Sequence, residues 1–161
     1  MAEIVIRDAG PDDAETMLDF IRDLAVFERE PDAVSTTAAD LRRFGWGAEK
    51  VFDALIAELD GQPVGFALFF RNFSTWEGRP GFYLEDLYVT DGARGHGIGL
   101  RLVARIARKC LEAGGRRLDL AVLDWNPARD FYDRIGFRDM ADWRPYRLTG
   151  SGLRDLAAGD G

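Results

Sequence analysis

Residues 83–89 read Tyr-Leu-Glu-Asp-Leu-Tyr-Val, and residues 94–100 read Arg-Gly-His-Gly-Ile-Gly-Leu. The first stretch is an apolar run of strand type, and a helical pattern over 97–113 follows from the second. Glycines let a backbone approach a ligand closely, and the free N–H groups at a helix start favour a bound anion. This order of strand, glycine-rich loop and helix favours a phosphate-binding turn over a merely flexible connection.

The spacing of the glycines narrows the kind of phosphate ligand. They stand at 95, 97 and 99, and no lysine follows them. This pattern differs from the G-x-x-x-x-G-K-[ST] loop of P-loop nucleotidases and from the G-x-G-x-x-G turn of dinucleotide folds. The loop also follows an antiparallel run, whereas a dinucleotide turn opens a strand–helix–strand unit. Both nucleotide-binding classes are therefore disfavoured.

Outward from this turn, the hydrophobic periodicity predicts a single α/β domain over 1–150 and a C-terminal tail over 151–161. The expected order is β-α-α-β-β-β-α-β-α-β, with a mixed central sheet. The expected strands cover 3–7, Val51–Glu58, Val64–Phe70, Phe82–Val89, 118–122 and 143–149, and a turn at 60–63 joins the second to the third. The expected helices begin at Pro11, at about residue 36 with Ser35 or Thr36 as N-cap, at Gly97, and at Pro127 with Asn126 as N-cap.

Composition disfavours several classes of protein. The 161 residues are 47% hydrophobic, which suffices for a core, and no apolar stretch is long enough to span a membrane. The formal charge of −7 argues against a general nucleic-acid binder, although residues 91–117, which hold the glycine-rich loop, are basic. The single cysteine, Cys110, permits no internal disulfide and no zinc site by itself, so we expect no metal. The N-terminus lacks a signal-peptide pattern, and we expect a cytoplasmic protein.

Glu85 and Asp86 are two carboxylates in the middle of an apolar strand. Burying an unpaired carboxylate is costly, and strand alternation points neighbouring side chains to opposite faces. At least one of the two is therefore expected to face a polar cavity, a cation or a hydrogen-bond network, unless it lies on a solvent-facing edge. A carboxylate in such surroundings suits a general base or a cation-binding site.

Residues 124–132 read Asp-Trp-Asn-Pro-Ala-Arg-Asp-Phe-Tyr. Tyr132 lies beside the apolar side of the expected short helix, and on this pattern alone it is an ordinary tyrosine at the edge of the core. Cys110 lies on the apolar stripe of the long helix, so we interpret it as a buried hydrophobic residue rather than a nucleophile. His96 is the only histidine, and we interpret it as a loop residue without a catalytic role.

Taken together, these stretches resemble the GNAT superfamily of N-acetyltransferases, and within it the diamine acetyltransferases that act on spermidine, spermine or thialysine. The resemblance rests on the Glu-Asp strand, on R-G-x-G-I-G in the loop and on W-N-x-x-x-x-F-Y over 125–132. The loop is specific only to the superfamily. The Tyr-Leu-Glu-Asp strand combined with Val-Leu-Asp-Trp-Asn over 122–126 is more specific, and the resemblance covers nearly the whole chain.

The resemblance implies a role for each matching residue, with acetyl-CoA as the cosubstrate. Backbone groups of a splayed strand at Leu87, Tyr88 and Val89 would hold the pantetheine arm, and Asn126 and Arg129 would line the arm and its thiol end. The pyrophosphate would bind at Arg94, Gly95, His96, Gly97, Ile98, Gly99 and Leu100. Glu85 would accept the proton of the amine, and Tyr132 would be the general acid. The amine substrate would contact Phe27, Glu28, Trp76, Glu85 and Asp86, and the family is typically homodimeric.

The implied reaction is direct transfer of acetyl from acetyl-CoA to a primary amine of a small diamine, polyamine or thialysine-like substrate. Spermidine/spermine enzymes tend to have an acidic residue two positions before the tryptophan of Ser74-Thr75-Trp76, and its absence favours a small amine over spermine. Two alternatives stay open: acetylation of a protein or peptide, and acyl-CoA binding without catalysis. Neither nucleic acid nor a membrane is an expected partner.

Overall fold

The computed structural model describes all of residues 1–161 and divides the chain into two compact units, Met1–Asn126 and Pro127–Gly161. The first unit contains every strand and the glycine-rich loop. The domain boundary that we expected after residue 150 falls within the second unit and stays a prediction.

A five-stranded mixed sheet forms the centre of the first unit, with the strands in the order β1-β2-β3-β4-β5. The first four strands pair antiparallel, and β5 pairs parallel to β4, so the predicted mixed sheet is confirmed. Asp60 and Gly61 have φ values of 51° and 80°, as a two-residue hairpin between β2 and β3 requires. The strands are β1 (Ile4–Asp8), β2 (Asp53–Leu59), β3 (Gln62–Ser74), β4 (Arg79–Val89) and β5 (Leu118–Leu120).

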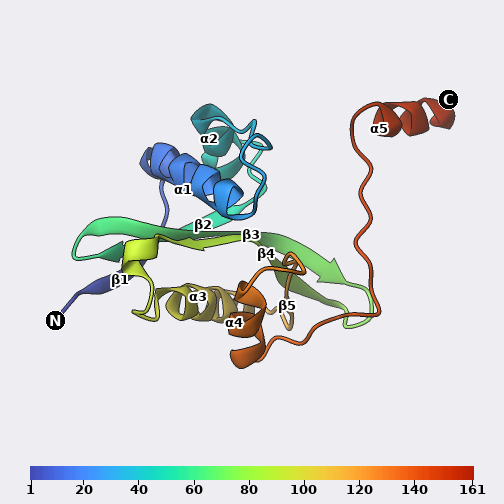
Figure 1. Cartoon of the computed structure of the whole chain (residues 1–161). Helices are drawn as coiled ribbons and strands as arrows, with labels where there is room; N and C mark the ends of the chain where they lie inside the picture. The colour runs from blue at the N-terminus through green and yellow to red at the C-terminus, as the bar shows by residue number, and fades with distance from the viewer. The chain divides into compact units, whose positions relative to one another are not determined.

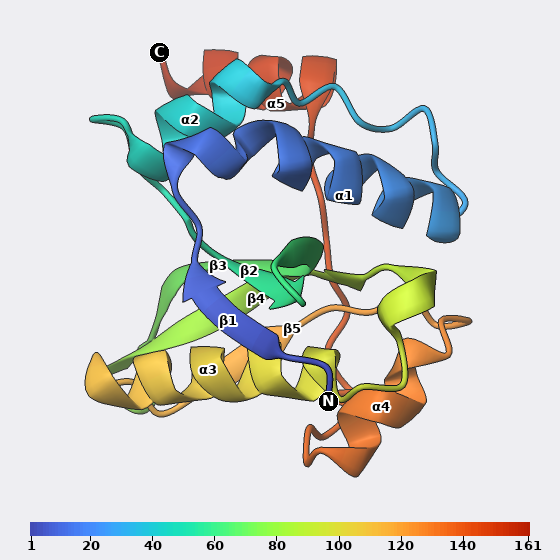
Figure 2. The same ribbon diagram turned by 90° about the vertical axis from the view of Figure 1, so that its left-hand side faces the viewer.

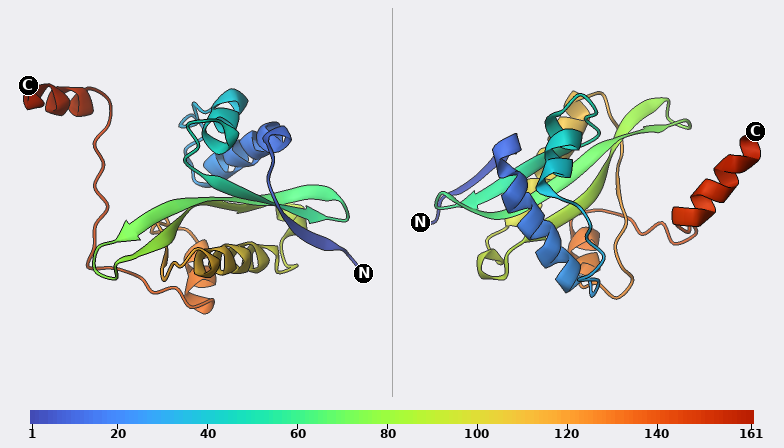
Figure 3. Two further views of the ribbon diagram at one scale, coloured as in Figure 1. Left: turned by 180° about the vertical axis from the view of Figure 1, so that it is seen from behind. Right: turned by 90° about the horizontal axis from the view of Figure 1, so that it is seen from above.

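Helices cover both faces of this sheet (Figure 1). α1 (Ala14–Phe27), which a 3-10 turn at Pro11–Asp13 precedes, lies with α2 (Ala38–Trp46) on one face, and α3 (Ile98–Glu112) lies on the other. Figure 2 and the left panel of Figure 3 show the same arrangement, with helices on both sides of the sheet, from the side and from behind. None of the helices has the length and the apolar character that a bilayer crossing requires.

Different apolar stripes bury the two faces of the sheet. Under α1, Met17 and Phe20 pack on Phe66 of β3, with the two phenyl rings 5.7 Å apart. On the opposite face, α3 buries its predicted stripe, at the end of which Cys110 is 4% exposed. The interpretation of Cys110 as a buried hydrophobic residue is confirmed. Full burial of a side chain of the size of Met17 or Phe20 stabilises the fold by about 1.5–3 kcal/mol.

The second helix begins later in the chain than expected. Its N-cap is Thr37, whose hydroxyl accepts a bond from the Asp40 amide at 3.1 Å, while the Asp40 carboxylate accepts from the Thr37 N–H at 2.9 Å. The prediction of Ser35 or Thr36 was wrong because only Thr37 has an acidic residue three positions later, which completes the capping box.

The second unit contains α4 (Ala128–Arg134), α5 (Gly150–Ala157) and a final 3-10 turn, but no strand. The prediction of a strand over 143–149 is therefore wrong. The structure ends in α5 and a 3-10 turn where the predicted order ended in a strand. Residues 138–150 are all exposed, and no strand of the sheet pairs with them, so their backbone lacks the partners that a strand needs. The α4 helix begins at Ala128, with Pro127 rather than Asn126 at the cap position.

Candidate active site

A β-bulge interrupts β4 at its two adjacent carboxylates. Leu68 of β3 is in register with Asp86, and the next residue, Phe69, is in register with Leu84. Glu85 is therefore an extra residue without a cross-strand partner, which is the mark of a bulge. The bulge interrupts the alternation that we expected at the two carboxylates, because it inserts one residue into the pleat.

Ring contacts show how the bulge changes the direction of the side chains. Tyr83 stacks on Phe70 at 5.2 Å, and Tyr88 lies 5.8 Å from Phe20 of α1. Phe70 and Tyr88 both pack against the core beneath α1. In a regular strand, residues five apart point to opposite faces. The extra residue has therefore moved the side chains after it, including Asp86, to the α1 face.

Three acidic side chains gather at this point, and we refer to Glu28, Glu85 and Asp86 as the carboxylate cluster. Glu28 is the last residue of the α1 turn, at its C-cap. Burial, reinforced by the charges of Glu85 and Glu28, raises the pKa of Asp86 to about 7. Burial, reinforced by the charge of Glu85, also raises the pKa of Glu28. The three carboxylates repel one another when they are ionised. A bound cation would relieve this repulsion, so the cluster attracts a cation.

Beyond the bulge, one edge of β4 has no neighbouring strand. The pairing of β4 with β5 covers only Phe82 to Leu84, opposite Leu118 to Leu120. On the other side, β3 remains paired as far as Val89. Backbone groups of residues 85–89 that point away from β3 are thus open to an extended ligand, which can add to a free edge as a strand does. The splayed strand that the sequence predicted is present.

The glycine-rich loop leads into the first turn of α3. Gly95 and Gly97 have φ values of 87° and 73°, a conformation that favours glycine. No side chain caps the helix, and the regular ladder starts with the bond from Arg101 N–H to the Gly97 carbonyl at 3.1 Å. The amides of residues 98–100 donate to no acceptor in the chain. They form an anion site of the kind that a pyrophosphate fits.

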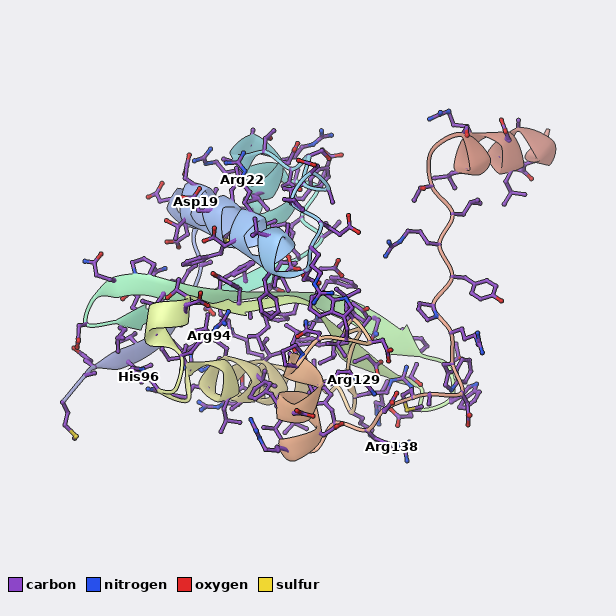
Figure 4. The ribbon with its side chains drawn as sticks, in the orientation of Figure 1. Asp19, Arg22, Arg94, His96, Arg129 and Arg138 are labelled. Carbon is purple, nitrogen blue, oxygen red and sulfur yellow. The ribbon has the colours of Figure 1, made fainter.

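Arg94 and His96 lie on the segment between β4 and α3 (Figure 4). The Arg94 Nε–H donates to the Val89 carbonyl at 3.0 Å, and its guanidinium pairs with Asp91 at 2.8 Å. Its side chain thus lies along the open edge of β4 rather than over the helix start. The Nδ1 atom of His96 is 3.0 Å from the Ala93 carbonyl, and the ring is exposed. This bond orients the imidazole within the loop.

Aromatic rings connect the end of α1 to the turn after β5. The ring centroids of Phe27 and Trp125 are 6.2 Å apart, and both side chains are partly exposed. The Arg29 guanidinium lies 3.8 Å from the centre of the Trp125 ring. On the other side, the Arg94 guanidinium lies 5.5 Å from the Phe27 ring and 5.9 Å from that of Tyr88. Cation–π contacts therefore hold two arginines among the aromatic rings around Phe27, the residue before Glu28.

Other predicted site residues lie elsewhere in the chain. Asn126 is 9% exposed and ends the first unit. Tyr132 of α4 lies in the second unit, where its ring contacts Phe131 at 5.2 Å and Phe137 at 5.5 Å. Arg129 pairs with Asp139 at 3.4 Å in the same unit.

The structure separates Trp76 from the carboxylate cluster. Trp76 lies in the connection between β3 and β4 and is 85% exposed. The bulge is six residues further along β4 than its start at Arg79, which corresponds to about 20 Å of strand. Within one chain, the predicted contact of Trp76 with the same substrate as Glu85 is therefore not assembled.

Sequence comparisons agree with this geometry. Residues 18–137 match the acetyltransferase (GNAT) family. The chain is 38% identical to thialysine N-epsilon-acetyltransferases of Sus scrofa and of Bos taurus, over 98% of this chain and 99% of each relative. Among solved structures, an integron cassette protein from V. cholerae superposes with a TM-score of 0.80 at 25% identity, covering 96% of this chain and 97% of that one.

The protein belongs to the acetyltransferase (GNAT) family, as the splayed sheet, the glycine-rich turn and the family match together define. It is an acetyl-CoA-dependent N-acetyltransferase.

Two residues that contact each other near the end of α1 were missed as candidates in the sequence. Arg29 follows the predicted Phe27-Glu28 pair, and Trp125 precedes the predicted Asn126. An arginine beside a glutamate has no distinctive pattern, and only the fold brings it onto the indole ring. The bulge was missed as well, because a single extra residue leaves the apolar run of 83–89 unchanged.

Proposed function

We propose that the enzyme acetylates the primary amine of a small basic amino acid, diamine or polyamine, by direct attack of the amine on acetyl-CoA. The observation that carries this proposal is the meeting of an open strand edge and a carboxylate cluster at one bulge. The open edge suits an extended acyl carrier, and the carboxylates suit an ammonium group.

The cosubstrate side of the site uses backbone groups. Leu87, Tyr88 and Val89 would pair with the amides of the pantetheine arm along the open edge, and the loop over 94–100 would take the pyrophosphate. Two observations support this assignment: β5 ends at Leu120, and the first amides of α3 have no acceptor. Asn126 and Arg129 are proposed to line the thiol end. Acetyl-CoA itself supplies the acetyl thioester.

The amine side of the site is the carboxylate cluster. An alkyl amine has a pKa near ~10.4, so it arrives as an ammonium and must lose a proton before it attacks. Glu85 is proposed to take this proton, directly or through water, while Glu28 and Asp86 hold the ammonium beside Phe27. Asp86 is a second candidate for the proton acceptor, because a pKa of about 7 suits a base that works at neutral pH.

Collapse of the attacked thioester releases the CoA thiolate, which needs a proton. Tyr132 is proposed as the general acid for this step. A thiol pKa near ~8.5 makes the thiolate a fair leaving group. Proton donation by Tyr132 would therefore speed the departure of the thiolate. A backbone N–H of the open β4 edge would stabilise the oxyanion that forms before departure.

The relatives favour a particular group of amines. Enzymes named for the Nε-acetylation of thialysine match over nearly the full length, and a human spermidine/spermine N(1)-acetyltransferase-like protein matches at 34% identity. The chain covers 94% of its own length in that match but only 23% of the human protein. We therefore propose a thialysine-like amine ahead of a polyamine, as the sequence Ser74-Thr75-Trp76 also favours.

A homodimer is proposed as the working assembly. The second unit exposes large apolar side chains that water does not favour, among them Trp143 at 65%, Tyr146 at 94% and Leu156 at 69%. A second copy that covers them would also supply sheet partners for the segment over 143–149, which has none in its own chain. The cytoplasmic location stays a prediction.

The test is thiol release from acetyl-CoA with a panel of thialysine, lysine, ornithine, putrescine, spermidine, spermine and a short peptide. We expect saturable release with one or more small amines. Release with the peptide alone would favour a protein acetyltransferase. Tight CoA binding without release on any member would favour a non-catalytic acyl-CoA module. Either result contradicts the proposal.

A substitution tests the role of Tyr132. We expect Tyr132→Phe to lower turnover by roughly 100-fold while CoA binding is kept, because one proton transfer is lost. Tyr146→Phe is the matched control, since Tyr146 lies in the same unit and is 94% exposed. Unchanged turnover in Tyr132→Phe would exclude the assigned role.

A further inference from the structure

Arg29 is a cationic residue one position after Glu28, a member of the carboxylate cluster. Its guanidinium lies on the face of Trp125, 3.8 Å from the ring centre. Arg29 has a φ of 63°, a left-handed conformation that non-glycine residues rarely adopt. The bond from its N–H to the Val26 carbonyl, at 3.1 Å, closes the end of α1 in this conformation.

No carboxylate pairs with this guanidinium. Other arginines of the first unit, including Arg7, Arg42 and Arg43, form ion pairs with acidic neighbours. Arg29 forms none, although Glu28 is adjacent in the chain. A guanidinium stacked on a ring uses its face for the contact and keeps its N–H donors at its rim. These donors match the planar geometry of a carboxylate from outside the chain.

The carboxylate cluster and Arg29 thus favour opposite charges on one ligand. The carboxylate cluster suits an ammonium, and Arg29 suits a carboxylate. A diamine or polyamine satisfies only the first group and places a second positive charge near the guanidinium. A basic α-amino acid satisfies both, because it carries an ammonium on its side chain and a carboxylate at its other end.

We infer that Arg29, supported by the Trp125 ring, binds the α-carboxylate of a basic amino-acid substrate and so selects it over the corresponding diamine. This inference rests on the proposed acetylation of a small amine and names the group that sets the choice of substrate. The carboxylate is held by charge-assisted hydrogen bonds in the plane of the guanidinium. The side-chain amine of the same molecule reaches the carboxylate cluster, where it loses its proton.

Matched substrate pairs isolate the carboxylate. Lysine and cadaverine differ only by the carboxyl group, and so do ornithine and putrescine. The measurement is the ratio of kcat/KM for the amino acid to that for its diamine, from CoA thiol release. In the wild-type enzyme we expect this ratio to exceed one. In Arg29→Ala we expect it to fall roughly 10- to 100-fold, as the loss of hydrogen bonds to a charged group predicts.

Further variants separate binding from a structural effect. Arg29→Gln keeps a polar side chain with N–H donors, although a shorter one, and removes the charge, so we expect most of the same loss. Arg29→Lys keeps a charge without the planar fork and should restore part of the ratio. Trp125→Leu removes the ring on which the guanidinium rests and should lower the ratio less than Arg29→Ala. Arg22→Ala, on the exposed surface of α1 (Figure 4), should leave the ratio unchanged.

The outcomes distinguish this inference from the proposed function. An enzyme that acetylates both members of each pair, with a ratio that neither Arg29→Ala nor Arg29→Gln changes, would overturn the role of Arg29 and leave the proposed function standing. A wild-type ratio below one would do the same. A wild-type enzyme that releases no thiol with any amine would overturn both. Equal falls of kcat/KM for amino acid and diamine would indicate a structural role and also overturn the inference.

Discussion

The two halves of β4 have the same neighbour on one side and different surroundings on the other. Residues 79–84 pair with β3, and over Phe82 to Leu84 also with β5, where Phe82 and Leu84 are 4% and 2% exposed. Residues 86–89 pair only with β3, Glu85 pairs with neither strand, and none of these residues is fully buried. The same strand therefore forms core in its first half and a binding edge in its second, and the change occurs at the bulge.

This difference shows how a strand can itself supply binding groups to a site. A fully paired strand has no backbone groups left for a ligand, whereas a strand that loses one partner retains them in a fixed geometry. Because β3 still holds the second half, the open edge is rigid. The bulge adds the second component, since it turns Asp86 toward α1 and toward Glu28.

Insertion of one alanine between Asp86 and Leu87 would have the largest effect on this comparison. A residue added after the bulge would turn Leu87, Tyr88 and Val89 to the other face of the pleat, so Tyr88 would leave the core beneath α1. We expect a loss of about 5 kcal/mol or more in the free energy of unfolding, enough to unfold many domains of this size. Urea unfolding measures it.

The control for this insertion is Glu85→Ala. This variant keeps the register, and it should change stability by about 1 kcal/mol or less because the side chain is exposed. An insertion variant as stable as Glu85→Ala would show that β4 can shift its register after the bulge without cost, contrary to the fixed faces that we assign to residues 86–89.

In the paired half, Phe82→Ala should have the next largest effect. Phe82 is 4% exposed and its ring lies 5.3 Å from that of Phe69. Its removal leaves a cavity, and we expect a loss of about 3–5 kcal/mol in urea unfolding. Phe73→Ala, at a position that is 63% exposed, is the control and should cost far less. Equal losses in the two variants would mean that the paired half is not the core side of the strand.

In the open half, Asp86→Asn should change the pH dependence of stability. The pKa of Asp86 is about 7 in the folded chain and near 3.8 when unfolded, so the folded state holds the proton more tightly. Stability therefore falls as the pH rises from about 4 to about 7, where ionisation leaves a charge against Glu85 and Glu28. The amide removes this loss. We expect Asp86→Asn to be about 2 kcal/mol more stable than the wild type at pH 8, with little difference at pH 4.

Urea unfolding at both pH values checks this prediction, with Asp12→Asn as an exposed control. A difference between Asp86→Asn and the wild type that is the same at pH 4 and pH 8 would contradict the raised pKa. Turnover of the same variant across this pH range would also show whether Asp86 takes part in the proton transfer.

The paired half could be predicted from the sequence, and so could much of the fold. Alternation and turn residues place β2, β3 and β4, and the stripe that ends at Cys110 places α3 on the sheet. The strand expected over 143–149 shows the limit of this reasoning. An apolar, β-prone segment becomes a strand only where another strand accepts its hydrogen bonds, and local sequence does not contain that partner.

The open half could be predicted only in part. The Glu-Asp pair and the glycine-rich loop mark where the site lies, because a carboxylate in an apolar run needs an explanation. The turn of Asp86 toward the α1 face depends on one inserted residue, and the stacking of Arg29 on Trp125 joins segments almost a hundred residues apart. Such contacts follow from tertiary packing and have no local pattern.

The smallest effect is expected at Arg94, whose side chain bonds to the last residue of the open half of β4. Arg94 donates to the Val89 carbonyl at 3.0 Å and pairs with Asp91 at 2.8 Å, both at an exposed position. A hydrogen bond and an ion pair of this kind together contribute about 1 kcal/mol, so Arg94→Ala should cost about that much in urea unfolding. The loop over 94–100 would lose its link to β4, and we expect CoA to bind several-fold more weakly by calorimetric titration. Arg101→Ala on exposed α3 surface is the matched control. If both variants bind CoA equally well, the link between loop and strand does not contribute to the site, and the open edge of β4 and the start of α3 act independently.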